Sequence, residues 1–171
     1  MSWREPMRRA RTAVAALALA TPLAGCLTPL YGGGSGVVAE LQAIAVDPVP
    51  ERLGHTLHDE LLSDLNGTGA SPRPKYRLAL DAHERVQTAL VDIVTRRASN
   101  ATVVVDIDYV LTPVDGGPPV AVGTVTSAAS YNRSEQRFAN IRAARDAEIR
   151  DAKVVADEIT QRLAAALATR R

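Results

Sequence analysis

Residues 101–111 read ATVVVDIDYVL, and apolar and polar side chains alternate along most of this stretch. The odd-numbered positions form an apolar set: Val103, Val105, Ile107, Tyr109 and Leu111. Asp106 and Asp108 lie on the opposite side of the same stretch. A period of two is typical of a β-strand with one buried face. The stretch therefore predicts a sheet with one face packed on a core and a second face that meets water or a partner.

Further strands are expected on both sides of this one. Downstream, the turn-forming residues 115–119 (DGGPP) predict a hairpin loop that leads into a strand over 120–131. Upstream, residues 75–88 alternate well enough for a strand, and the apolar run 89–94 extends it. The three strands are expected to pair as a meander.

Two amphipathic helices are predicted around these strands. Residues 52–65 place Leu53, Leu57, Leu61 and Leu65 four apart, which forms one stripe of a helix. Residues 136–168 contain no Gly or Pro and are rich in Ala, Glu and Arg, which favour helix. One apolar stripe of this second helix is expected to lie on the sheet: Phe138, Ile141, Ile149, Ala152, Ala156, Ile159, Leu163 and Leu167.

A fourth strand is predicted over residues 37–46, before the turn formers Asp47 to Pro50. Together these elements predict one α+β domain over residues 37–171. Its architecture is a two-layer sandwich, with two helices packed on one face of a four-stranded, mostly antiparallel sheet.

The start of the chain has the parts of an export signal. A basic stretch contains Arg4, Arg8, Arg9 and Arg11, an uncharged run extends over residues 12–24, and small residues precede Cys26. Thirteen uncharged residues reach only about 20 Å as a helix, which is short of the roughly 30 Å hydrocarbon core of a bilayer. Residues 1–25 are therefore predicted to be a cleaved signal peptide, not a membrane span.

The tetrapeptide Leu23-Ala24-Gly25-Cys26 resembles a bacterial lipobox. The resemblance implies cleavage before Cys26 and attachment of acyl chains such as palmitate to that residue, and several chains together make a lasting anchor. Leu27 stands where an aspartate often marks retention in the inner membrane, which by resemblance favours the outer membrane. The Gly-rich residues that follow predict a lipidated N-terminus and flexible tether over 26–36.

The apparent basicity of the chain belongs to the signal. The whole chain has a net charge of +1, and removing residues 1–25 takes away four of 20 basic and one of 19 acidic residues, which leaves a net charge of −2. A nucleic-acid binder needs a positive excess on one face, so no nucleic-acid partner is expected. Cys26 is the single cysteine, so once it is acylated no disulfide or thiolate site can form.

Candidate catalytic groups are few. His55 and His58 lie three apart on the first predicted helix and form a conceivable metal pair, against the simpler interpretation of solvated histidines. Asp106 and Asp108 point the same way, as paired carboxylates for acid–base chemistry would, but polar residues on the wet side of a strand are commoner. We therefore expect no catalytic residues, no metal and no cofactor, and a protein that is not an enzyme.

Short segments in a defined order carry a family resemblance: residues 28–32 (TPLYG), 52–54 (RLG), 95–97 (TRR) before the long strand, 130–131 (SY) at the end of the last strand, and 146–147 (DA) in the last helix. Behind a lipobox, this succession resembles the lipopolysaccharide-assembly lipoprotein family LptE, in its short alphaproteobacterial form.

The resemblance implies an outer-membrane lipoprotein that faces the periplasm. It would plug the large β-barrel LptD and assist its assembly while lipopolysaccharide (LPS) passes to the cell surface. LPS carries clustered phosphates, so arginines in loops are the implied contacts: Arg96, Arg97, Arg133 and Arg137. The alternative for these arginines is solubilising charge that flanks strands.

Two functions from other classes stay open. One is an auxiliary lipoprotein of an ABC-type lipid transport system, which would associate with a transporter and not with a barrel. The other is an envelope-remodelling hydrolase, for which His55 and His58 would be needed.

Overall fold

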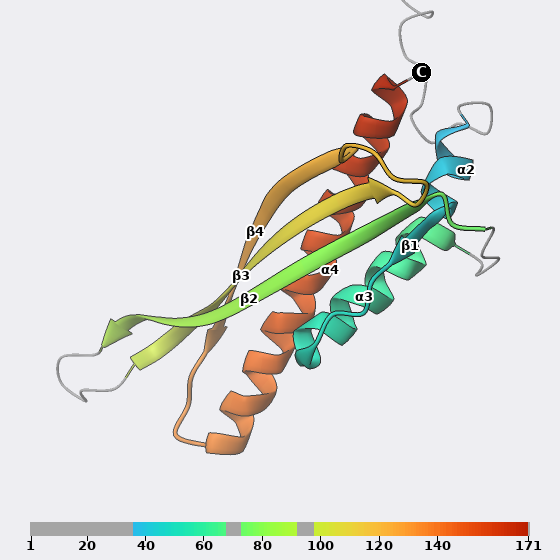
Figure 1. Cartoon of the computed structure of the whole chain (residues 1–171). Helices are drawn as coiled ribbons and strands as arrows, with labels where there is room; N and C mark the ends of the chain where they lie inside the picture. The colour runs from blue at the N-terminus through green and yellow to red at the C-terminus, as the bar shows by residue number, and fades with distance from the viewer. Residues whose placement is uncertain (1–35, 68–72, 92–97, 171) are drawn as a thin grey trace, which may run out of the picture. The chain divides into compact units, whose positions relative to one another are not determined.

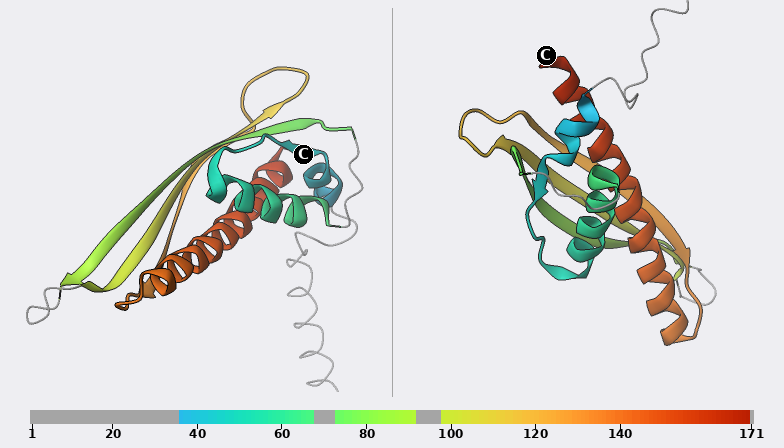
Figure 2. Two further views of the ribbon diagram at one scale, coloured as in Figure 1. Left: turned by 90° about the horizontal axis from the view of Figure 1, so that it is seen from below. Right: turned by 90° about the vertical axis from the view of Figure 1, so that its right-hand side faces the viewer.

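The computed structural model describes residues 36–67, 73–91 and 98–170. Seven elements follow one another in this part of the chain: α2 (Val37–Gln42), β1 (Ile44–Val46), α3 (Glu51–Asn66), β2 (Tyr76–Val91), β3 (Ala98–Pro113), β4 (Ala121–Asn132) and α4 (Arg137–Thr169). The helices lie on one side of a four-stranded sheet (Figure 1, Figure 2). The predicted α+β sandwich is confirmed.

The sheet has the order β1-β2-β3-β4. β2, β3 and β4 pair antiparallel, so Leu78 lies opposite Leu111 and Ile107 opposite Val125. β1 pairs in parallel with β2, because α3 forms the crossover that a parallel pair requires. The odd-numbered residues of 101–111 in β3 are all buried, as predicted. We call the side facing the helices the inner face, and the opposite side the outer face.

The prediction of a strand over 37–46 is wrong for its first part. Residues Val37–Gln42 form the helix α2, and only Ile44–Val46 are a strand. Gly36 begins the helix with a φ of 61°, a left-handed conformation that suits glycine. Val37 and Leu41, four residues apart, are both buried. Tertiary burial of one helical stripe therefore overrides the strand propensity of the valines.

The long helix α4 is buried along part of its predicted stripe. Ala152, Ala156, Ile159, Leu163 and Leu167 are in the core, as predicted. The prediction is wrong for Phe138, Ile141 and Ile149, which are exposed. α4 extends beyond the start of α3 (Figure 1), so the first turns of α4 have no helix of the described chain beside them.

Side chains of α4 hold the backbone of the edge strand β4. Asp151 is 1% exposed and accepts hydrogen bonds from Ser127 Oγ at 2.5 Å and from the Ala129 amide at 3.1 Å. Arg150 donates to the Ser130 carbonyl at 3.2 Å, and Arg162 to the Thr124 carbonyl at 2.8 Å. This edge of the sheet is thereby covered by the helix. None of the helices in the described ranges is both long and apolar enough to span a membrane.

Candidate functional site

The outer face of the sheet is polar and internally bonded. Asp106 accepts from Arg85 and from Thr126, the latter at 2.7 Å. Asp108 accepts from Thr124 at 2.5 Å. Asp106 and Asp108 are therefore each held by a cross-strand hydroxyl, as expected for polar residues on the wet side of a strand. Such pairs stabilise a wet sheet surface.

The two histidines of α3 do not converge on a common ligand. His55 is exposed, and Nδ1 of His58 lies 3.7 Å from Asp59. Within the ranges that the structure describes, no three His, Cys, Asp or Glu side chains are grouped as a metal site would require.

The exposed start of α4 carries a surface that we call the basic apolar face, made of Phe138, Ile141, Arg142, Arg145 and Ile149. Phe138 is 70% exposed, Ile141 41% and Ile149 52%. These five residues are spaced by threes and fours, so they share one side of the helix. Exposed apolar side chains grouped among basic ones are unlike the scattered apolar residues of an ordinary surface and indicate an interaction site.

A hollow lies within this face. It has a volume of about 340 Å³ and is lined by Phe138, Arg142, Arg145, Asp146 and Ile149. The guanidinium carbon of Arg142 lies 6.0 Å from the centre of the Phe138 ring, at the limit of a cation–π contact. The hollow thus offers a single ligand apolar surface, two guanidinium groups and the carboxylate of Asp146, which accepts from Nε of Arg150 at 3.1 Å.

Local hydrogen bonds fix the start of α4. The Ser134 amide donates to Oδ1 of Asn140 at 2.8 Å, and the Asn140 side-chain amide donates to the Ser134 carbonyl at 2.9 Å. The Gln136 amide donates to Oγ of Ser134 at 3.2 Å. These bonds tie the loop after β4 to the first turn of α4. The part of the helix that carries the basic apolar face is therefore fixed in place.

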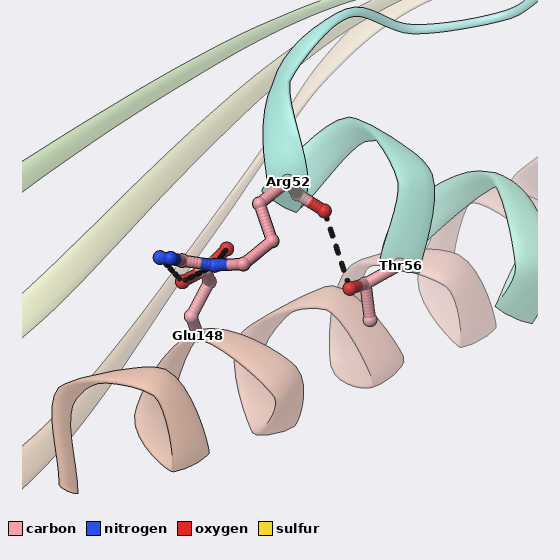
Figure 3. A network of polar contacts seen from close by, with 3 residues as sticks. All are labelled: Arg52, Thr56 and Glu148. Carbon is pink, nitrogen blue, oxygen red and sulfur yellow. Dashed lines mark hydrogen bonds and ion pairs between the residues drawn. The ribbon is translucent and has the colours of Figure 1, made fainter. Parts of the chain in front are cut away.

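An ion pair marks the point where α3 begins to cover α4. Glu148 is 2% exposed and accepts from Nε of Arg52 at 3.1 Å with each carboxylate oxygen (Figure 3). The hydrogen bond to Glu148 raises the pKa of Arg52, so the guanidinium stays charged. α3 therefore meets α4 at Glu148, and the exposed part of the stripe ends one residue later, at Ile149.

The sequence-predicted ligand residues fall partly in the described ranges. Arg133 and Arg137 are exposed. Arg133 lies in the loop after β4, as predicted, whereas Arg137 is the first residue of α4 and not a loop residue. The Arg133 amide donates to the Ser99 carbonyl at 2.9 Å, which places this loop beside the start of β3. Arg96, Arg97 and Cys26 lie outside the described residues.

The sequence interpretation missed Arg142 and Arg145. It assigned the apolar stripe of α4 to the sheet along its whole length, and it therefore treated the neighbouring arginines as solvated. The spacing Phe138, Ile141, Arg145, Ile149 was the available signal. Periodicity alone cannot say how far along a helix its partners extend.

Comparison with solved structures finds similar folds among bacterial lipoproteins. A candidate lipoprotein from Caulobacter crescentus CB15 is 25% identical with a TM-score of 0.65, over 80% of this chain and 98% of that one. A minor lipoprotein from Acinetobacter baumannii is 14% identical with a TM-score of 0.56, over 71% and 88%. The rare lipoprotein B from Shewanella oneidensis is 12% identical with a TM-score of 0.57, over 74% and 95%.

No protein-family model and no curated protein matches the sequence. The likeness to the Caulobacter protein supports a general class for the chain, a lipid-anchored lipoprotein of the cell envelope. The likeness to the other two structures shows a shared fold.

Proposed function

We propose that the chain is an outer-membrane lipoprotein of LPS transport, lipidated at Cys26, which joins an LptD β-barrel from the periplasmic side and contacts LPS. The observation that carries the LPS contact is the basic apolar face. Lipid A combines phosphates with acyl chains, and this face combines Arg142 and Arg145 with Phe138, Ile141 and Ile149.

The chemistry of the two groups is complementary. Guanidinium groups bind phosphate through paired, charge-assisted hydrogen bonds. The apolar side chains between them would contact the start of an acyl chain. Arg133 and Arg137 lie in the segment that leads into the face, and we propose them, with Arg96 and Arg97, as further contacts for the charged inner core.

The outer face of the sheet supports the barrel role. A plug must present polar groups to a water-lined barrel interior while it keeps its own core closed. The hydroxyls of Thr124 and Thr126 bond the carboxylates of Asp108 and Asp106 without help from a partner. This surface can therefore stay wet inside a barrel with both carboxylates hydrogen-bonded.

Titration of the mature chain with purified LPS tests the proposal. In the double variant Arg142→Glu/Arg145→Glu, loss of two charge-assisted contacts at roughly 1.5 kcal/mol or more each predicts about 100-fold weaker binding. Arg73→Glu is the matched control, because Arg73 is exposed in the segment before β2, at the other end of the sheet. Equal LPS affinity in the double variant and wild type, with circular dichroism unchanged, would refute the site.

Purification from membranes tests the partner. Wild type should co-purify with a large β-barrel, whereas recovery of an ABC-type transporter complex instead would favour that alternative. Cys26→Ala should release the chain into the periplasm and still allow it to bind the barrel, because the packed interface does not depend on the lipid.

A further inference from the structure

On the side away from β3, most of β2 has no strand beside it in the described chain. β1 pairs with β2 over three residues, ending at Val46 opposite Leu78, and the Asp47 amide donates to the Leu78 carbonyl at 2.9 Å. The chain then turns into α3 through Pro48 and Pro50. β2 continues to Val91 with β3 on its other side only (Figure 1). An edge of this length is a template for another strand.

The direction of the free backbone groups follows from two hydrogen bonds. The Tyr76 amide donates to the Ala43 carbonyl at 3.2 Å, and the Leu78 carbonyl accepts from Asp47, both on the side away from β3. Backbone groups alternate in direction along a strand, so the even-numbered residues of β2 point their N–H and C=O outward. Glu84 and Val86 therefore present unpaired backbone groups at this edge.

The side chains of these two residues point to the inner face, since Glu84 lies opposite Val105 and Val86 opposite Val103. Val86 is 53% exposed. Glu84 lies near the acidic groups Glu51, Glu148 and Asp151, with Arg52 as the cation among the groups that act on it. Desolvation, and then the charge of Glu148, raise the pKa of Glu84. The edge therefore offers an apolar contact next to an excess of negative charge.

A second copy of the chain does not complement this edge. When two β2 strands pair, side chains of one inner face stand beside those of the other. The described inner-face side chains of β2 include no basic residue: Tyr76, Leu78, Leu80, Ala82, Glu84, Val86 and Thr88. A β2 strand of a second copy would therefore bring no cation to Glu84, and a basic segment of another polypeptide fits the charge of this edge better.

We propose that the edge of β2 around Glu84 and Val86 accepts an extended segment of another polypeptide as an added strand, with a basic side chain beside Glu84 and an apolar side chain two residues away beside Val86. Main-chain hydrogen bonds supply the affinity and the two side chains the specificity. This site is separate from the basic apolar face and does not depend on the proposed role in LPS transport.

The test uses the mature chain and a fluorescent peptide, acetyl-Ser-Val-Thr-Lys-Thr-Val-Ser-amide, in which valines flank the lysine on one face in either strand direction. A second peptide has glutamate in place of the lysine. Wild type should bind the lysine peptide saturably and the glutamate peptide about tenfold more weakly, the equivalent of one charge pair. Glu84→Lys should reverse this preference.

Val86→Pro tests the backbone. The Val86 amide points away from β3, so proline there removes a free-edge donor and leaves the β2–β3 ladder intact. We expect peptide affinity to fall about tenfold or more, while Val86→Ala keeps the amide and loses less. Circular dichroism checks the fold of each variant.

Three results would overturn the proposal: no saturable binding by wild type, unchanged affinity in a folded Val86→Pro variant, or an unchanged peptide preference in Glu84→Lys. If Val86→Pro does not fold, the preference of Glu84→Lys decides the outcome.

Discussion

Gly54 lies inside helix α3, where the usual expectation is that alanine stabilises. Alanine is favoured over glycine in a helix interior by about 0.8–1.0 kcal/mol. In this structure, however, a Cβ atom on Gly54 would lie 2.6 Å from Cγ1 of Val49, 2.7 Å from its carbonyl oxygen and 2.8 Å from its carbonyl carbon. Val49 is itself 3% exposed and belongs to the loop that joins β1 to α3.

The clash should outweigh the helix propensity. Two of the three close atoms are backbone, so a change of side-chain rotamer cannot relieve the contact. Overpacking typically costs about 1–3 kcal/mol, and backbone displacement lies at the upper end of this range. We therefore expect Gly54→Ala to lower the free energy of unfolding by about 1–2 kcal/mol, net of the gain in propensity.

Urea denaturation followed by the helical circular dichroism signal measures this change. Ser63→Ala is the control, because Ser63 is exposed on the same helix, and we expect it to raise stability by about 0.5 kcal/mol or less. A Gly54→Ala variant more stable than wild type would refute the reasoning, since it would mean that the Val49 segment moves away at little cost.

Three other predictions concern stability. Asp151→Ala should cost about 2–4 kcal/mol in chemical denaturation, because it leaves a hydroxyl and an amide of β4 without their buried acceptor; a loss below that of an ordinary surface change would contradict this. Gly123→Val should disturb the near-ultraviolet circular dichroism of tyrosine, because a Cβ at Gly123 would lie 2.8 Å from the Tyr109 hydroxyl; an unchanged spectrum would count against it. Burial, and then the charge of Asp157, raise the pKa of Asp64, so stability is lost as the pH rises through the folded pKa. Asp64→Asn should therefore be more stable than wild type at neutral pH, with no advantage below the ordinary carboxyl pKa of 3.8, and urea melts across pH test this sign.

Local patterns predicted much of the fold. The alternation in residues 101–111 is a property of the strand itself, so it indicates the buried face of β3 without knowledge of the partners. The segment 37–42 was predicted wrongly, because its helix depends on the burial of Val37 and Leu41 against residues distant in sequence.

The candidate site was harder to predict from the sequence than the fold. Whether Phe138 and Ile149 are core or surface depends on where α3 begins beside α4. The contact between Arg52 and Glu148 marks that point. The outer-face bonds of Asp106 and Asp108 depend on strand register, and a shift by one residue would turn every side chain to the other face. Both features depend on contacts between segments that lie far apart in the chain.

The sheet differs at its two edges: α4 holds the backbone of β4, whereas on the side of β2 away from β3 no described strand pairs with it beyond Leu78. Growth of a fibre by repeated strand addition needs a molecule that can be extended in both directions. A chain whose sheet can be extended at one edge only would terminate such growth, because one added strand would occupy the single edge that is free to pair. The same asymmetry would let a protein kept at high local concentration on a membrane expose backbone groups without polymerising.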